Sequence, residues 1–481
     1  MMSRKKIIHL VISLAICGLL KIVLPTNTGL TPIGASVLGV FAASIYMWLT
    51  VGVDWTSFLI LGLLCLTGVA SSNEIWALSW GNNIIPLVVS VMILNAAVDE
   101  SGLAQKMARW FITRKVVQGK PYIFLAFFLL ANLLASFVMG VTAVVIIFLS
   151  MAESIWTNLG YQKEDKFAKA MALGVMWVSV VGYGATPIGH AVPLMIVGLA
   201  EANLGVTVSF YDYMLVGIPL ALIFFVIMML VFRFLLKPDC GKFQGYDIEA
   251  AKRENAPLTK KGKIVAVVFF AVVFLWIAPD IVKYILPDVA SFISSMGAVV
   301  PPFLAVALLC ILRVDNAPVL DFKASIKKVS WSSVMFMTAI NALGSCITME
   351  SAGIQEFLQS ICQPLANGLP LSLLVAAALL AVTVLTNFMS CGVSGTLVYS
   401  AFVPVIMAIP NNNIPILGLT VLIAIMSNVA FMTPSANPTA PLVFGPGYVS
   451  LGEGMKYGAI MVAASYIVCM AVIWPLTQLV F

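Results

Sequence analysis

Three long segments of the chain contain no aspartate, glutamate, lysine or arginine, and they decide its class. They are Tyr122–Ala152, Ala170–Ala200 and Phe357–Gly452. The whole chain is 61% hydrophobic and 10% charged, whereas a soluble domain is about half apolar and about a quarter charged. Because one crossing takes about 20 apolar residues, the sequence has room for roughly ten to twelve spans or half-spans. We therefore expect an all-α, polytopic membrane protein.

The basic residues indicate how the chain lies in its membrane. The first 25 residues combine a basic start with an apolar run, but the run is long and no small-residue cleavage site follows it, so we expect a transmembrane helix rather than a signal peptide. The other basic residues gather in short loops, as the positive-inside rule predicts for cytoplasmic loops. The net charge of +6 therefore indicates topology rather than nucleic-acid binding. We expect a multi-pass protein of the cell membrane with a cytoplasmic N-terminus.

Two halves of the chain repeat the same order of features. Trp80 opens an apolar segment that ends at Glu100, and Trp331 opens a second one, about 250 residues further on, that ends at Glu350. Each is followed by an amphipathic stretch. Such internal repetition is typical of transporters built from inverted repeats. The predicted parts are a first half (1–236), a basic cytoplasmic linker (237–263) and a second half (264–481).

Each half contains two apolar segments that are interrupted by small, polar or proline residues. The interruptions are 136–143, 182–193, 386–396 and 430–441. Lipid cannot satisfy the backbone groups of a broken helix, so such breaks persist only where they line a buried site or a wet cavity. Paired breaks in two halves point to the binding site of a transporter. We therefore expect a site near the middle of the membrane.

The interrupted segments contain no fixed charge, which limits what they bind and how. An anion would need hydroxyls, backbone N–H groups and helix N-termini, and a cation would use carbonyls freed at the same breaks. Thr142, Ser390 and Asn437 supply suitable side chains. His190 is the one ionisable group: it could donate to an anion, take up a coupling proton, or bond to a freed carbonyl as a neutral ring. The eight cysteines have no CxxC spacing, so a metal or disulfide framework is not expected.

At these residues the sequence resembles the divalent anion/sodium symporter family, which carries di- and tricarboxylates and sulfate. The clearest local match is AFMTPSANPTAPLVFG at Ala430–Gly445, which is similar to the family's AFxxPxATPPNAxVFG. The resemblance covers almost the whole chain. It implies roughly eleven transmembrane helices, two re-entrant hairpins ending near Glu100 and Glu350, and a homodimer. It also implies a scaffold part and a transport part that moves like an elevator.

The family holds its substrate and two sodium ions with two Ser-Asn-Thr signatures, and this chain departs from both. The first aligns onto Gly140-Val141-Thr142 and the second onto Ser390-Cys391-Gly392, so both asparagines are replaced. Either the substrate is less polar, or its second charge meets His190 and Asn437. The predicted substrate-binding residues are Thr142, His190, Ser390, Cys391, Gly392, Asn437 and Pro438. The predicted ion-binding residues are Ser136, Gly140, Gly189, Thr386, Met389 and Ala436.

The leading functional hypothesis is a secondary active transporter of an organic anion, with a di- or tricarboxylate-like substrate. Transport would be coupled to sodium or would exchange one anion for another, and no cofactor besides the coupling ion is expected. The alternatives are a proton-coupled transporter that uses His190 and, less favoured, a passive anion channel. A membrane enzyme would need a nucleophile, a metal cluster or paired carboxylates at depth, and the uncharged segment Phe357–Gly452 offers none. Expected partners are the small anion, lipid and a second copy of the chain, but not nucleic acid.

Overall fold

The computed structural model describes residues 4–26, 29–188, 190–245, 249, 257–366, 370–409 and 413–481. The described chain is helical almost throughout, and its strands are the antiparallel two-residue pair β1 (Arg313–Val314) and β2 (Ala317–Pro318). Eight of the described helices are long and apolar enough to cross a membrane. The predicted all-α, polytopic class is therefore confirmed.

Several apolar helices of the described chain are shorter than a full crossing. Six of them have 10–17 residues, and α14 (Pro287–Ser295) and α15 (Val300–Ile311) form an apolar pair bent by 73°, the geometry of a broken span or of a re-entrant loop. The predicted number of spans, roughly eleven, includes some of these short helices, because hydropathy does not separate a half-helix from a full crossing.

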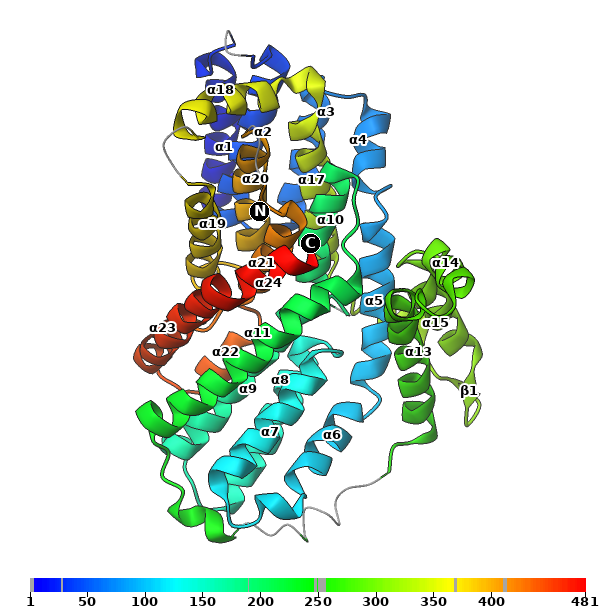
Figure 1. Ribbon diagram of the computed structural model, residues 1–481, viewed down its shortest axis with the longest axis vertical. Helices are drawn as coiled ribbons and strands as arrows, with labels where there is room; N and C mark the ends of the chain where they lie inside the picture. The colour runs from blue at the N-terminus through cyan, green and yellow to red at the C-terminus, as the bar shows by residue number, and fades with distance from the viewer. Residues whose placement is uncertain are drawn as a thin grey trace.

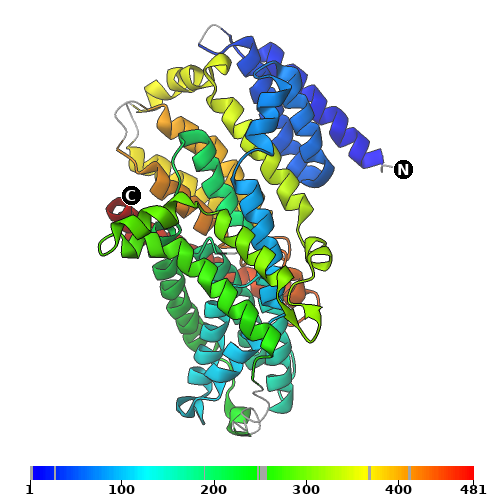
Figure 2. The ribbon, with the colours of Figure 1, turned by 90° about the vertical axis from the view of Figure 1, so that its right-hand side faces the viewer.

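Four helices from the N-terminal part form one end of the molecule, drawn in blue in Figures 1 and 2. They are α1 (Arg4–Val23), α2 (Pro32–Thr50), α3 (Asp54–Thr67) and α4 (Ser72–Ser79). α1 lies on the outside against α2, and its Leu19 and Ile22 are 60% and 83% exposed, as expected for a helix that faces lipid. Thr31 caps α2 by accepting a hydrogen bond from the N–H of Gly34 at 3.0 Å, and Pro32 occupies the first helical position, which suits proline.

The next part of the chain forms a hairpin and a broken helix. Its helices are α5 (Ile84–Asp99), α6 (Leu103–Ile112), α7 (Pro121–Ser136), α8 (Val141–Asn158), α9 (Lys166–Ala185), α10 (Ala191–Leu204) and α11 (Phe210–Val231). α7 and α8 pack against each other as the first hairpin, with residues 137–140 as its tip. α9 and α10 are the halves of a broken helix, separated by residues 186–190. In Figure 1 the first hairpin lies in the lower half of the molecule, in cyan.

The same order of elements recurs nearer the C-terminus. The helices are α17 (Trp331–Thr348), α18 (Ile354–Ala366), α19 (Leu371–Leu385), α20 (Cys391–Met407), α21 (Ile416–Met426), α22 (Ala440–Phe444), α23 (Leu451–Val468) and α24 (Trp474–Val480). α19 and α20 form the second hairpin, with residues 386–390 as its tip, and residues 427–439 separate α21 from α22. This hairpin lies in the upper half of Figure 1, so the two hairpins enter from opposite ends, as an inverted repeat requires.

The structure corrects the predicted places of the hairpins. Glu100 directly follows α5, and Glu350 begins the short helix η4 (Glu350–Ala352) after α17, so both residues mark the ends of long helices rather than of hairpins. The hairpin tips are instead the interruptions at 136–143 and 386–396, which the resemblance had placed in interrupted helices. Both arrangements consist of two apolar segments around a polar break, and hydropathy alone does not show whether the chain reverses there.

A separate group of helices connects the two series and packs beside α5, as the green ribbons in Figure 2 show. The group consists of α13 (Lys260–Val282), α14, α15 and α16 (Phe322–Ile326). Nε1 of Trp276 donates to the carbonyl of Ala298 at 2.9 Å and ties α13 to the start of α15. α13 begins at Lys260, inside the predicted linker, and linker residues 246–248 and 250–256 lie outside the described residues.

Short turns of helix join several of these elements. η2 (Phe232–Leu236) and η5 (Cys469–Ile473) are π-helical turns that continue α11 and α23, and η1 (Lys115–Val117) and η3 (Gly241–Gly245) are 3-10 turns in loops.

The predicted interruption at 182–193 is shorter in the structure, because Gly182 and Gly184 lie inside α9. A Cβ atom at Gly182 would lie 2.7 Å from the Cβ of Ser136, and one at Gly184 would lie 2.7 Å from the Cβ of Asn428. These glycines therefore allow α9 to pack closely against the end of α7 and against the second break. They do not break the helix.

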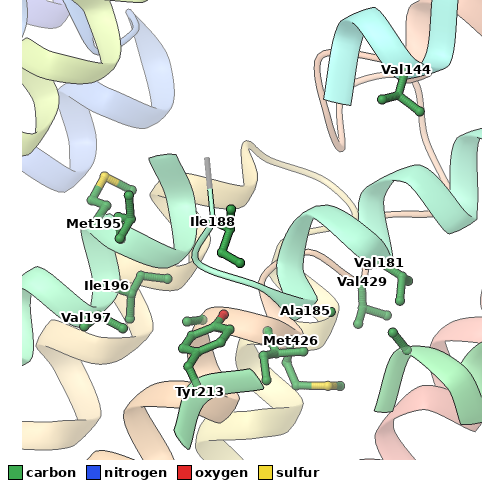
Figure 3. Close-up of a cluster of buried hydrophobic side chains, with 14 of the residues drawn as sticks. Val144, Val181, Ala185, Ile188, Met195, Ile196, Val197, Tyr213, Met426 and Val429 are labelled. Carbon is green, nitrogen blue, oxygen red and sulfur yellow. The ribbon is translucent and has the colours of Figure 1, made fainter. Parts of the chain in front are cut away.

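α11 supports the end of α9 directly before the first break. Figure 3 shows Tyr213 of α11 among Ala185 and Ile188 from the first broken helix and Met426 from α21. The hydroxyl of Tyr213 donates to the carbonyl of Gly184 at 2.8 Å, so α11 also satisfies a carbonyl that the end of α9 leaves free.

We expect Gly217→Ala in α11 to destabilise the protein by about 1–3 kcal/mol, as overpacking usually does. A Cβ atom there would lie 2.1 Å from the carbonyl oxygen of Ala185, and backbone cannot move aside like a flexible side chain. The matched control is Gly62→Ala in α3, which has no atom within 4 Å of its added Cβ. The apparent unfolding temperature in detergent should fall for Gly217→Ala alone, and equal values for the two variants would contradict the packing argument.

Candidate functional site at the two hairpin tips

A buried network centred on Asn132 fixes the end of the first hairpin's first arm. Oδ1 of Asn132 accepts a hydrogen bond from the hydroxyl of Ser179 at 2.8 Å, and Nδ2 donates to the carbonyl of Val175 at 3.1 Å, which ties α7 to α9. Ser136 is completely buried and donates to the carbonyl of Asn132 at 2.8 Å. The polar groups of this last turn are therefore satisfied inside the protein, as membrane depth requires.

His190 lies directly against this first tip. Its Nε2 is 2.8 Å from the carbonyl oxygen of Ser136, and a carbonyl only accepts, so Nε2 is the protonated nitrogen. The imidazole is completely buried, and its centroid lies 4.2 Å from that of the Tyr183 ring. Thr186 donates to the carbonyl of Phe137 at 2.5 Å. Two residues of the first break thus satisfy carbonyls that the end of α7 leaves free, and for His190 this is one of the three roles considered from the sequence.

Asn387 joins the tip of the second hairpin to the second break with four hydrogen bonds. Its Nδ2 donates to the carbonyls of Thr383 and Val429, each at 2.8 Å. Its Oδ1 accepts from the N–H groups of Phe431 at 2.8 Å and Met432 at 3.0 Å. Asn387 was not among the predicted site residues, although an amide within a long uncharged segment must find partners inside the protein.

The predicted ion and substrate residues of the second tip also contact the second break. Thr386 is completely buried and donates its hydroxyl to the carbonyl of Ser427. The thiol of Cys391 donates to the carbonyl of Ala436 at 3.3 Å. The second tip and the second break are therefore one connected unit, like the first tip and the first break.

The amide of Asn437 is largely used within its own loop. Its Oδ1 accepts from the N–H groups of Thr439 at 2.9 Å and Ala440 at 2.8 Å, which caps α22, and its Nδ2 donates to the carbonyl of Ala430 at 2.8 Å. One N–H of this amide is left for another acceptor, so its capacity to bind an anion is smaller than the sequence suggested.

A cavity of about 160 Å³ lies between the two tips. The N-termini of α8 and α20 both reach it, through Val141 on one side and Ser390, Cys391 and Gly392 on the other. Ser390, the N-cap of α20, makes no side-chain capping bond in the described chain, so the first N–H groups of this helix are available to an anion. The lining residues are uncharged.

One amide at this cavity lacks a partner. Asn428 is 1% exposed and lines the cavity. Its Nδ2 donates to the carbonyl of Ala424 at 2.8 Å, whereas its Oδ1 has no hydrogen-bond partner among the described residues. A buried amide oxygen without a partner costs free energy, and a bound cation or a donor on a substrate would satisfy it.

The structure brings most of the predicted substrate residues together at this cavity but not all of them. Thr142 lies in the first turn of α8 with an exposed side chain and does not line the cavity, and His190 reaches it only through its contact with Tyr183. The predicted substrate residues that line the cavity are Ser390, Cys391, Gly392, Asn437 and Pro438.

The predicted ion-binding residues are distributed over the two tips and the second break. Ser136 and Gly140 lie at the first tip, Thr386 and Met389 at the second tip, and Ala436 in the second break. Gly189 lies outside the described residues.

A carboxylate that was not predicted from the sequence lies at the first tip. Asp99 is the last residue of α5, and its Oδ1 accepts a hydrogen bond from the N–H of Gly140 at 3.3 Å. Gly140 is the N-cap of α8 and has no side chain with which to cap the helix. The acidic pair Asp99-Glu100 could have indicated it from the sequence. Only Glu100 was assigned a place there, as the end of a hairpin.

Opposed hairpins, paired broken helices and a cavity between their tips define a multi-pass membrane transporter. Residues 4–480 match the model of one protein family, described as the sodium:sulfate symporter transmembrane region. The chain therefore belongs to this family, which confirms the resemblance seen in the sequence and makes the protein a transporter rather than an enzyme.

Individual relatives support the same assignment. The sodium-dependent dicarboxylate transporter SdcS of Staphylococcus saprophyticus is 24% identical over 460 residues, which cover 91% of this chain and 86% of the relative. An uncharacterized transporter of Haemophilus influenzae is 24% identical over 361 residues, covering 74% and 73% of the two chains. The crystal structure of the Alcanivorax borkumensis YdaH transporter matches with a TM-score of 0.56 at 13% identity, over 83% of this chain and 86% of that one. This last likeness concerns the fold alone.

Proposed function

We propose that the protein is a secondary active transporter of a small organic carboxylate, bound in the cavity between the two hairpin tips. The observation that carries this proposal is the N-terminus of α20, which meets the cavity without a side-chain cap in the described chain. Helix N-termini bind anions through free N–H groups and the helix dipole. Uncharged lining residues favour transport over trapping, because no fixed opposite charge holds the anion in the membrane.

Sodium is the proposed coupling ion. The relatives named SdcS are sodium-dependent, and the tips and breaks contain carbonyl and hydroxyl oxygens of the kind that bind hard cations. In this proposal the ion-binding residues are Ser136, Gly140, Gly189, Thr386, Met389 and Ala436. The amide oxygen of Asn428, which lines the cavity without a hydrogen-bond partner in the described chain, is an added candidate ligand.

The mechanism that we propose is an elevator movement in a homodimer. The hairpins and broken helices would move together as the transport part, because hydrogen bonds join each tip to its neighbouring break. The helices at the N-terminal end would form the static part. The halves 1–236 and 264–481, the cytoplasmic linker 237–263 and a cytoplasmic N-terminus complete the proposed topology.

Uptake into proteoliposomes tests this function. We expect purified protein to concentrate at least one carboxylate from a panel of labelled mono-, di- and tricarboxylates when sodium is present outside, with saturation, and to lose this uptake when choline replaces sodium. Concentrative uptake also excludes a passive channel. Failure to transport any carboxylate of the panel, with correctly inserted protein, would refute the proposal.

Proton coupling through His190 is the second candidate. It is favoured by the complete burial of His190 and by its hydrogen bond to the first tip, since a group that changes charge there would alter the tip directly. Uptake in sodium-free medium that follows a pH gradient and disappears in His190→Ala would establish this alternative.

We expect Ser390→Ala to raise the half-saturation concentration about tenfold or more, because hydrogen bonds to charged groups contribute about 1.5–3 kcal/mol. Ser390 lines the cavity, whereas Thr142 lies at the first tip with an exposed side chain. The sequence alone predicts weaker binding for both alanine variants, and the structure predicts a smaller loss for Thr142→Ala. Initial uptake rates over a range of substrate concentrations measure both, and equal losses would contradict the placement of the anion at α20.

A further inference from the structure

A group of basic residues precedes the first hairpin and has no counterpart before the second. Residues 101–122 contain no acidic residue and five basic ones, which are Lys106, Arg109, Arg114, Lys115 and Lys120. The equivalent amphipathic helix of the second half, α18, carries Glu356 and no cation. α18 lies at the upper end of Figure 1 and α6 in the lower half. The inverted repeat thus places the two helices towards opposite ends of the molecule, and only α6 is basic.

α6 turns its cations away from the protein. It packs against α7 and α8, and its buried residues, among them Leu103, Ala108 and Ile112, share one face. Lys106 and Trp110 lie on the opposite face, where the side chain of Trp110 is 47% exposed. A helix with an apolar inner face and with lysine, arginine and tryptophan on its outer face is typical of the membrane surface.

The guanidinium of Arg114 is held over the Trp110 ring. Its Cζ lies 3.7 Å from the centroid of this ring, and its Nε donates to the carbonyl of Trp110 at 2.9 Å. The other N–H groups of the guanidinium remain for a further acceptor. Within the part of the chain that the structure describes, Arg114, Lys115 and Lys120 form no ion pair. No described carboxylate therefore takes the place of an external anion.

A fourth cation reaches this region from the end of α11. Arg233 lies in the turn η2, and its Cζ is 4.8 Å from the centroid of the Tyr122 ring, two residues after Lys120. Arg233 is exposed, and the next residue, Phe234, is 61% exposed. Cations beside exposed apolar side chains at the end of a span can reach lipid headgroups while the apolar groups contact acyl chains.

The positive-inside rule explains on which side of the membrane these cations lie, but it does not explain their arrangement. The rule requires basic residues only somewhere in a short loop. Here two segments that are far apart in the sequence bring cations together, each stacked on or next to an aromatic ring. Anionic lipids of the cytoplasmic leaflet attract such clusters.

We propose that an anionic phospholipid of the surrounding bilayer binds at a basic surface made by four cations: Arg114, Lys115, Lys120 and Arg233. The cations hold the headgroup phosphate, and the exposed rings of Trp110 and Phe234 contact the acyl chains. The basic surface lies on the segment between α5 and the first hairpin and includes the end of α11. Bound lipid would therefore hold the base of this hairpin against α11.

Thermal unfolding of the purified full chain in a neutral detergent tests this proposal. Phosphatidylglycerol and phosphatidylcholine with the same acyl chains are added over a range of concentrations, and glycerol 3-phosphate supplies a phosphate without acyl chains. We expect phosphatidylglycerol alone to raise the apparent unfolding temperature with saturation, because a ligand that binds the folded state stabilises it. Replacement of all four cations by glutamine should weaken the apparent affinity for phosphatidylglycerol at least about tenfold.

The matched control removes the same net charge elsewhere. It replaces by glutamine four exposed cations around α13 and α16: Lys263, Arg313, Lys323 and Lys327. This variant should keep the affinity of the wild type. Native mass spectrometry gives a second readout that does not depend on the unfolding of any variant, since wild-type protein purified from mixed lipid should retain more phosphatidylglycerol than phosphatidylcholine.

Equal losses of affinity in the two glutamine variants would overturn the proposal, because they would show a general attraction between a cationic protein and anionic micelles. Equal stabilisation by phosphatidylglycerol and phosphatidylcholine, or by neither, would also overturn it. Stabilisation by glycerol 3-phosphate that the four substitutions remove would assign these cations to a soluble phosphoester instead of a lipid.

Discussion

Asn387→Ala is expected to destabilise the protein by about 3 kcal/mol or more, because it leaves buried backbone groups without partners. The amide of Asn387 accepts from the N–H groups of Phe431 and Met432 and donates to two carbonyls. Alanine removes all four bonds, and neither lipid nor a neighbouring helix turn replaces them inside the break. The second hairpin should then separate from the second break, and carboxylate uptake should be lost.

Two measurements check this effect. The apparent unfolding temperature in detergent should fall, and amide hydrogen exchange should rise at Phe431 and Met432 before the rest of the protein exchanges. Asn158→Ala is the control, because Asn158 is exposed at the end of α8 and its amide makes a long contact of 3.5 Å with Ser154. Unchanged exchange at residues 431–432 in Asn387→Ala would show that another group holds the break together.

The positions of the breaks were predictable from the sequence for a simple physical reason. Where glycine, proline and small polar residues end a helix inside an apolar segment, they leave backbone groups that need partners, and in a membrane such breaks persist only where they are buried in protein or line a wet cavity. The predicted interruptions at 136–143, 386–396 and 430–441 each contain residues that lie outside helices in the structure. The long uncharged segments predicted the all-α membrane fold class in the same direct way.

The extent of the break at 182–193 was not predictable from the same pattern. Gly182 and Gly184 were assigned to a break, although they lie in α9 and allow it to approach Ser136 and Asn428. A glycine that relieves crowding between helices has the same appearance in a sequence as a glycine that ends a helix. Only the three-dimensional neighbours separate the two roles.

The sequence predicted the part of the candidate site at the second hairpin tip, whereas its prediction for the first tip was incomplete. Ser390, Cys391 and Gly392 line the cavity, because an interruption and a helix start coincide there. The partner of Gly140 is Asp99, which precedes it by 41 positions, and no periodicity or local motif reports such a distant contact. The sequence therefore indicated an uncharged site, and the structure adds one carboxylate at its edge.

Gly392→Leu is expected to abolish transport while the protein still folds and inserts. Gly392 lies in the first turn of α20 and lines the cavity. A Cβ atom there would lie 2.9 Å from the terminal methyl of Met195, a flexible group, so Gly392→Ala should keep part of the activity. Leucine would extend further into a space of about 160 Å³ and cover the N–H groups that bind the anion.

The matched control is Gly452→Leu in α23, where an added Cβ meets no atom within 4 Å. Both leucine variants should elute as the wild type does in size-exclusion chromatography and should unfold at similar temperatures, since each gains a helix-favouring residue. Sodium-driven carboxylate uptake should fall by at least about tenfold in Gly392→Leu alone, because a loss of about 1.4 kcal/mol already gives that factor. Uptake of Gly392→Leu at the rate of Gly452→Leu would place the substrate away from the second hairpin tip and would contradict the carboxylate site proposed at the N-terminus of α20.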